Sequence, residues 1–284
     1  MTGIKFWNVY CFCKKTIEHM NYIKTLLFFI LIFVGISVFS QNNAKLKNEA
    51  YTYGEKLKYR LYYHSLLTGK MTAGIASMEI EKNAVIMSGR NTYHIEAIGK
   101  SKGIFNWFYK VHDRFETFID EDSLVPLSFI RRTHEGGYVV NDDVIFDHVN
   151  LVATSKQETK KIEPNTQDII SAFYYARTLD FSNLKAGDSF PLVFYLDDSV
   201  YTSIIKYLGK EEINIEAGKF KTMKFKPMVV TGDAFSDPYP MTLWISDDKN
   251  RIPLLVESAV VVGSVKMELI KYSGLRNPLT SQVE

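Results

Sequence analysis

Apolar and polar residues alternate along much of the chain with the period of two that is typical of β-strands. In the segment 56–63 (KLKYRLYY), one set of alternate positions is Leu57, Tyr59, Leu61 and Tyr63, and the other set is Lys56, Lys58, Arg60 and Tyr62. Because successive side chains of a strand point to opposite faces, this pattern predicts a half-buried strand with one wet face. The period recurs in 221–230 (KTMKFKPMVV), where Pro227 lacks an N–H and therefore predicts an edge strand or a bend.

Further segments with strand character follow one another along the rest of the chain. They are 73–80, 92–99, 111–120, 127–134, 138–147, 151–159, 190–196, 200–210, 241–246, 254–262 and 265–272. Glycine turns at 134–137 (HEGG) and 262–264 (VGS) separate neighbouring segments, as expected for hairpins. The chain is therefore predicted to be mainly β.

One segment, 168–179 (DIISAFYYARTL), has helical spacing instead. Its apolar positions are Ile169, Ala172, Phe173 and Ala176, widened by Ile170 and Tyr174. Asn165 or Thr166 is the expected N-cap, with Asp168 in the favourable first turn. So wide an apolar face predicts a helix that packs into a sheet. The segment 102–109 (KGIFNWFY) is compatible with either a short helix or an aromatic loop.

The residues 20–40 (MNYIKTLLFFILIFVGISVFS) have the organisation of a secretory signal. Lys24 precedes an apolar run at 26–39, and small residues stand before Gln41, where cleavage is expected. A retained membrane anchor is the alternative, but a spanning helix needs about 20 apolar residues. The residues 1–19 do not resemble the start of a signal, so we expect translation to begin at Met20.

Composition narrows the class of protein further. Both cysteines, Cys11 and Cys13, precede the signal, so the exported chain is expected to be stabilised by its core without disulfides. Hydrophobic residues make up 46% of the chain, enough for a substantial core. The formal net charge is only +2, so no nucleic acid partner is expected.

These features predict the following organisation. We expect a non-native extension at 1–19, a signal peptide at 20–40, a flexible lead-in at 41–50, a single β-rich domain at 51–275 and a tail at 276–284. The domain is predicted to be a large curved antiparallel sheet, a half-barrel or open barrel, with one helix packed against it. After removal of the signal, the protein is expected to be soluble in the periplasm or outer cell envelope.

Motifs for metal binding and phosphate binding are missing from the sequence. It contains no HExxH or CxxC motif and no glycine-rich phosphate loop before a helix. The histidines lack the usual spacing of zinc ligands. We therefore expect no catalytic residue, no metal and no cofactor. Two carboxylates brought together by folding could still hydrolyse glycans, which is retained as a weaker alternative.

Aromatic residues are the most distinctive feature of the predicted domain. They either fill a core or line an apolar cavity between the sheet and the helix. In the second case, the residues expected to contact a ligand are Tyr59, Tyr63, Trp107, Phe173, Tyr174 and Arg177.

Two charges, Asp168 and Arg177, lie on the otherwise apolar helix. A buried charge needs a partner, and Glu55 and Asp113 are candidates for Arg177. Arg177 is expected either to form an ion pair that fixes the helix to the sheet or to anchor a ligand head group.

Several short motifs occur in an order that resembles a known family. They are 53–59 (YGEKLKY), 113–116 (DRFE), 168–177 (DIISAFYYAR), 243–247 (LWISD) and 251–253 (RIP). With the signal segment, they resemble the exported bacterial domain-of-unknown-function family 3108. The resemblance implies an envelope location and a curved β-sheet, similar in outline to the half-barrels of lipoprotein-localisation factors. It supplies no catalytic residues.

Three functions are compatible with these observations. The first is a non-enzymatic envelope protein that binds a lipid or another amphiphile. The second is a structural or assembly partner of another envelope protein, which exposed apolar patches or open strand edges would favour. The third is a hydrolase of envelope glycans.

Overall fold

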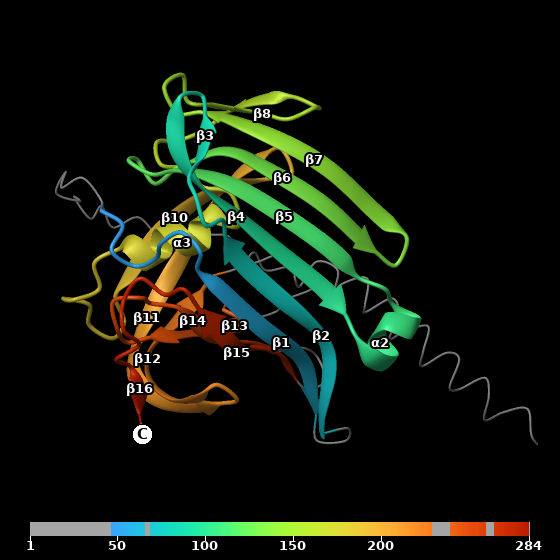
Figure 1. Ribbon diagram of the computed structural model, residues 1–284, viewed down its shortest axis with the longest axis vertical. Coiled ribbons are helices and arrows are strands. Elements are labelled where there is room, and N and C mark those ends of the chain that lie inside the picture. The colour runs from blue at the N-terminus through green and yellow to red at the C-terminus, as the bar shows by residue number, and fades with distance from the viewer. Residues whose placement is uncertain (1–46, 66–68, 229–238, 260–263, 284) are drawn as a thin grey trace, which may run out of the picture.

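The computed structural model describes residues 47–65, 69–228, 239–259 and 264–283, and its strands form one large antiparallel sheet (Figure 1). The predicted signal segment and both cysteines lie outside the described residues. The strands are β1 (Lys56–Ser65), β2 (Gly69–Ile80), β3 (Val85–Met87), β4 (Arg90–Ser101), β5 (His112–Asp120), β6 (Pro126–Glu135), β7 (Tyr138–Asp147), β8 (Val152–Thr154), β9 (Thr159–Lys161), β10 (Ser189–Leu196), β11 (Ser199–Ile215), β12 (Gly218–Pro227), β13 (Met241–Ser246), β14 (Pro253–Ala259), β15 (Ser264–Ser273) and β16 (Gln282–Val283).

The strand order runs β10-β11-β12-β13-β14-β15-β1-β2-β4-β5-β6-β7-β8-β9, so the first strand pairs with one of the last at the centre of the sheet. β3 is added beside β4, and β16 beside β12. Bulges interrupt the register of several pairs, including β1 with β2 and β11 with β12. Because bulges increase local twist, they help to curl the sheet. The predicted curved, open sheet is confirmed, and it is not closed into a barrel.

Most predicted strands are confirmed, and the differences have local causes. The segment 151–159 was expected to be one strand, but it contains the short strand β8 and the turn to β9. Pro227 was expected at an edge or bend, yet β12 lies inside the sheet and Pro227 is its final residue. Pairing of β12 with β13 stops at Phe225, so no N–H is needed from Pro227 on that side.

The helix α3 (Ser171–Thr178) begins later than expected, and the predicted cap at Asn165 or Thr166 is wrong. Asp168 Oδ1 accepts hydrogen bonds from the backbone N–H groups of Ile170 (2.7 Å) and Ser171 (2.8 Å). Ser171 Oγ in turn accepts from the N–H of Asp168 at 2.8 Å. These reciprocal bonds resemble a capping box and satisfy amides that the helix leaves free. The second helix, α2 (Gly103–Phe108), resolves the open prediction for 102–109.

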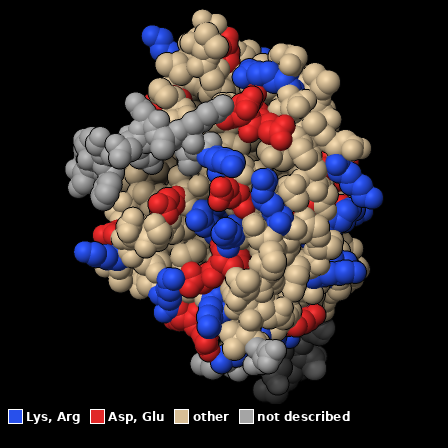
Figure 2. Space-filling view, turned by 60° about the vertical axis from the view of Figure 1, so that its left-hand side comes forward, with Lys and Arg blue, Asp and Glu red and all other residues tan. Residues whose placement is uncertain are grey.

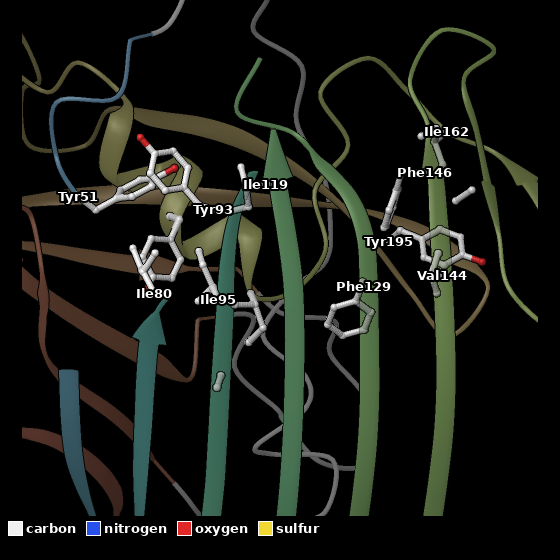
Figure 3. Close-up of a cluster of buried hydrophobic side chains, with 14 of the residues drawn as sticks. Tyr51, Ile80, Tyr93, Ile95, Ile119, Phe129, Val144, Phe146, Ile162 and Tyr195 are labelled. Atoms are coloured by element: carbon white, nitrogen blue, oxygen red, sulfur yellow. The ribbon is translucent and has the colours of Figure 1, made fainter. Parts of the chain in front are cut away.

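The main core lies between the two halves of the rolled sheet, with α3 inside it. Ile80, Ile95, Thr117, Phe129 and Val144 pair in register from β2 to β7, so their side chains share one face. Figure 3 shows the apolar members of this row following one another across neighbouring strands.

Residues from distant parts of the chain complete this core. Tyr174 of α3 and Tyr195 of β10 belong to the same buried cluster, and the Tyr195 ring meets the Phe146 ring at 5.8 Å. The face that carries α3 is therefore the concave face of the roll.

Two predicted features of the surface also differ from the structure. Tyr62, expected on the wet face, is buried beneath charged side chains, with Lys70 Nζ 3.9 Å from its ring centre. At the ends of the predicted domain, Asn48 and Ala50 of the lead-in and Ser281 of the tail are buried. Elsewhere acidic and basic side chains lie next to one another on the face drawn in Figure 2, as the near-neutral composition implies.

Candidate functional site

Arg177 fixes the buried side of α3 to the sheet through an ion pair with Glu55. Its guanidinium donates to both carboxylate oxygens of Glu55, at 2.6 and 2.7 Å, and neither side chain has more than 4% exposure. Further donor groups of Arg177 reach the backbone oxygens of Asn250 (3.0 Å) and Ala50 (3.4 Å). This fork is the bidentate geometry that makes Arg–carboxylate pairs strong. The structure pairs Arg177 with Glu55 rather than with Asp113.

The surroundings of the pair favour its charged form. Burial alone would lower the pKa of Arg177, but the charge and hydrogen bonds of Glu55 raise it above its usual range. The rings of Tyr51 and Tyr174 lie 5.4 and 5.1 Å from the guanidinium carbon. The partners that the structure gives Arg177 are groups of the protein itself, which is the arrangement expected of an ion pair between the helix and the sheet.

Asp168, the other charge expected in an ion pair, has a different environment. It is fully buried, and its partners are the Thr117 hydroxyl and the amides at the start of α3. None of these donors is a cation. Burial raises the pKa of Asp168 to about 6, although the hydrogen bonds oppose that shift.

The residues predicted to contact a ligand are not all brought together. Tyr59 and Tyr174 are buried near Arg177, and Tyr63 and Phe173 are partly exposed. Trp107 is 80% exposed on α2 and contacts Phe108, outside the buried clusters. The structure therefore places the expected aromatic set partly in the core and partly on the surface.

Asp113 meets another carboxylate beneath α2. It accepts a hydrogen bond from the backbone N–H of His134 at 3.0 Å and is hydrogen-bonded to the Glu135 carboxyl. A hydrogen bond between two carboxyls requires a proton on one of them, and burial raises the pKa of Asp113. Glycoside hydrolysis needs carboxyl groups about 5–9 Å apart. This pair is in direct contact, so it lacks that geometry.

A row of paired residues crosses the concave face and changes character along its length. It consists of Leu57, Met78, Ala97, Phe115, Arg131 and Asp142, one from each strand between β1 and β7. The row is apolar up to Phe115 and charged at its end. Leu57, Ala97, Arg131 and Asp142 are buried, whereas Met78 and Phe115 are partly exposed.

The charged end of this row lies against the turn between β10 and β11. Arg131 Nη1 donates to Asp197 of that turn at 2.7 Å. Asp142 is 9% exposed, and its Oδ1 makes no hydrogen bond within the described residues. Burial, and then the neighbouring Asp198, raises the pKa of Asp142. Asp142 Oδ1 therefore has an open position to accept a hydrogen bond from a donor that does not belong to the described residues.

A second set of apolar residues continues across the other half of the concave face, and we call it the concave row. It comprises Leu61, Met267, Val256 and Leu243, which pair in register across β1, β15, β14 and β13. All four side chains are partly exposed. Each alternation was visible in the sequence, but the row itself depends on register between distant strands, so sequence reasoning did not identify it.

Other features of the described residues bear on chemistry and location. No three His, Cys, Asp or Glu side chains there form a group able to hold a metal ion. In the same part of the chain, no helix combines the length and apolarity needed to cross a bilayer.

Comparison with known proteins gives one matching family and several matching solved structures. The model of the family "protein of unknown function (DUF3108)" matches residues 58–270. No curated protein matches the chain. A β-barrel-like protein of the DUF1849 family from Brucella abortus is 11% identical, with a TM-score of 0.52, covering 79% of this chain and 98% of that one. It supports the fold alone.

Two further structures are more distant. A candidate exported protein with a YmcC-like fold from Bacteroides fragilis is 12% identical, with a TM-score of 0.34. A candidate lipoprotein from Parabacteroides distasonis is 10% identical, with a TM-score of 0.35. Each alignment covers 79% of this chain and 97% of the other.

Proposed function

The chain belongs to the DUF3108 family, and from this premise we propose that it is an exported, non-enzymatic protein that holds an apolar or amphiphilic ligand on its concave face. The observation that carries the proposal is the concave row. Leu61, Val256 and Met267 point to the inner side of a rolled sheet, yet they remain partly exposed. Apolar surface left open inside a fold is favourable only when something covers it.

The polar residues on the same face indicate the type of ligand. Arg131 and Asp142 lie on the strands β6 and β7, across the sheet from the concave row. A ligand with an apolar chain and a hydrogen-bonding head group would use both regions, whereas a pure hydrocarbon would use only the first. We therefore favour a lipid or a similar amphiphile.

Export is proposed from the sequence segment 20–40, which lies outside the described residues. The expected product begins at Gln41. N-terminal sequencing of the protein from the cell envelope tests this, and a product that retains residues 20–40 would contradict it.

The ligand proposal can be tested with two adjacent residues that face opposite ways. Val256 belongs to the concave row, while Glu257 points to the convex face and pairs with Lys266 at 3.1 Å. Native mass spectrometry of the purified protein should show an adduct that organic solvent extracts as a lipid. The Val256→Gln variant should lose at least about 80% of this adduct because an amide is costly to bury without a partner. The Glu257→Gln control should retain it.

The outcome also separates the alternatives. A protein without adduct, or equal adduct in both variants, would contradict the concave-face site. Capture of one stoichiometric envelope protein by a lipid-free sample would instead select the assembly function.

A further inference from the structure

The short helix α2 presents large apolar side chains directly to solvent. Trp107 is 80% exposed, Phe108 61% and Ile104 55%, and none of the helix residues is buried. Single exposed apolar residues are common on proteins. Three such residues on one six-residue helix, including a tryptophan, form a patch that calls for a partner.

This patch is held rigidly. Before the helix, the N–H of Lys102 donates to Ala73 of β2 at 2.8 Å. After it, Tyr109 donates its hydroxyl to the backbone oxygen of Glu135 at 3.1 Å, and the N–H of Gly136 donates to Lys110 at 2.9 Å. The helix is therefore fixed to β2 on one side and to the β6–β7 turn on the other.

The charged residues of the segment that carries the patch have one sign. Lys100, Lys102 and Lys110 flank the helix, and all three are exposed. Between residues 97 and 112 the sequence contains no acidic residue, and Asp113, which follows, is buried. The segment thus carries three positive charges on a chain whose formal net charge is only +2.

We propose that α2 and its flanking lysines dock the protein on the surface of an anionic lipid bilayer. Tryptophan and phenylalanine are favoured at the boundary between head groups and acyl chains, where Trp107, Phe108 and Ile104 would insert. Lysines next to such a patch are attracted by anionic head groups. This charge complementarity selects a lipid surface over a neutral apolar protein groove. The proposal is independent of any ligand on the concave face.

The test measures the environment of Trp107 in the protein that begins at Gln41. Vesicles of phosphatidylethanolamine with 30% phosphatidylglycerol, containing brominated acyl chains, quench tryptophans that enter the bilayer. The chain that begins at Gln41 has two tryptophans, Trp107 and Trp244, so the Trp107→Phe variant supplies the emission of Trp244 for subtraction. We expect the Trp107 emission to fall at least about twofold. The Trp107 emission should be unchanged with phosphatidylcholine vesicles. It should also be unchanged with the anionic vesicles when Lys100, Lys102 and Lys110 are all replaced by glutamine.

A matched control places a tryptophan elsewhere. Val149 is 90% exposed and follows the far end of β7, whereas α2 contacts the turn before that strand. A Val149→Trp substitution in the Trp107→Phe background should therefore show no quenching. Equal quenching at both positions, or no quenching of Trp107 with anionic vesicles, overturns the proposal. A lipid-free dimer that Trp107→Asp dissociates, seen by sedimentation, would also overturn it and assign the patch to a second copy.

Discussion

At the scale of single residues, the buried pair of Arg177 and Glu55 governs how α3 is held. The two residues are 122 positions apart in sequence, and each is inaccessible to solvent. A buried ion pair gives little net stability compared with apolar residues of similar size, but loss of one partner leaves an uncompensated charge. The pair therefore contributes mainly to specificity, because it favours the one position of α3 in which Arg177 reaches Glu55.

We predict that Arg177→Met lowers the free energy of unfolding by about 3–5 kcal/mol, because Glu55 is left buried without its cation. The double variant Glu55→Met, Arg177→Met should lose clearly less than the single one. Urea unfolding measures both. The exposed pair of Lys160 and Glu158, 2.9 Å apart, is the control, and Lys160→Met should leave stability unchanged. A single variant as stable as the parent would contradict the structural role.

Asp168 gives a prediction for pH. Burial raises its pKa to about 6, above the ~4 of an unfolded aspartate, so the folded state binds the proton more tightly. Its contribution to stability is therefore complete below pH ~4, falls as the pH rises to about 6, and is constant above that. Measured by unfolding at several pH values, the parent should lose stability relative to Asp168→Asn across this window. A difference that stays flat or rises would refute the assignment.

Sequence reasoning identified Asp168 and Arg177 as charges on an apolar helix, but it could not assign their partners. Glu55 and Asp113 were equally available because the choice depends on which distant strands lie beneath the helix. The helix start was misplaced for a different reason. Asn165 and Thr166 satisfy the local rule for a cap, but the side chain that accepts the amides at the start of the helix is that of Asp168, which is buried against Thr117.

At the scale of elements, hairpin strands were predicted well because their alternation and their glycine turns are local. The strand 138–147 has its predicted bounds, and so does 241–246. The division of 151–159 into β8 and β9 was missed, since each strand has only three residues and too few positions to show a period. α2 could not be distinguished from a loop because no buried face marks its period.

The attachment of α2 depends on Gly136, which gives an element-scale prediction. Gly136 has φ +54°, and a Cβ there would lie 2.1 Å from the Tyr109 ring. We expect Gly136→Ala to lower the free energy of unfolding by roughly 2–3 kcal/mol through the clash and the positive φ. Gly89 has φ +75° in open space, so Gly89→Ala should cost only about 1 kcal/mol. Equal losses in thermal or urea unfolding would show that Tyr109 does not hold the turn.

At the scale of the whole molecule, the sheet is curled so that side chains of β10 and β7 meet, and Tyr174 of α3 belongs to the same buried cluster. The curvature and the mainly β class were predictable from alternation and turns. The strand order was not, because β1 pairs with β15, about 200 residues later in the sequence. This central pairing joins Leu61 to Met267 and so creates the concave row. The candidate ligand surface is thus a property of the assembled sheet.

The most direct test of the concave site is a crystal structure of the protein purified from the cell envelope without lipid extraction. The account predicts elongated electron density along Leu61, Met267, Val256 and Leu243, with its polar end toward Arg131 and Asp142. A concave row covered by the chain's own side chains, with no volume left for a ligand, would contradict it.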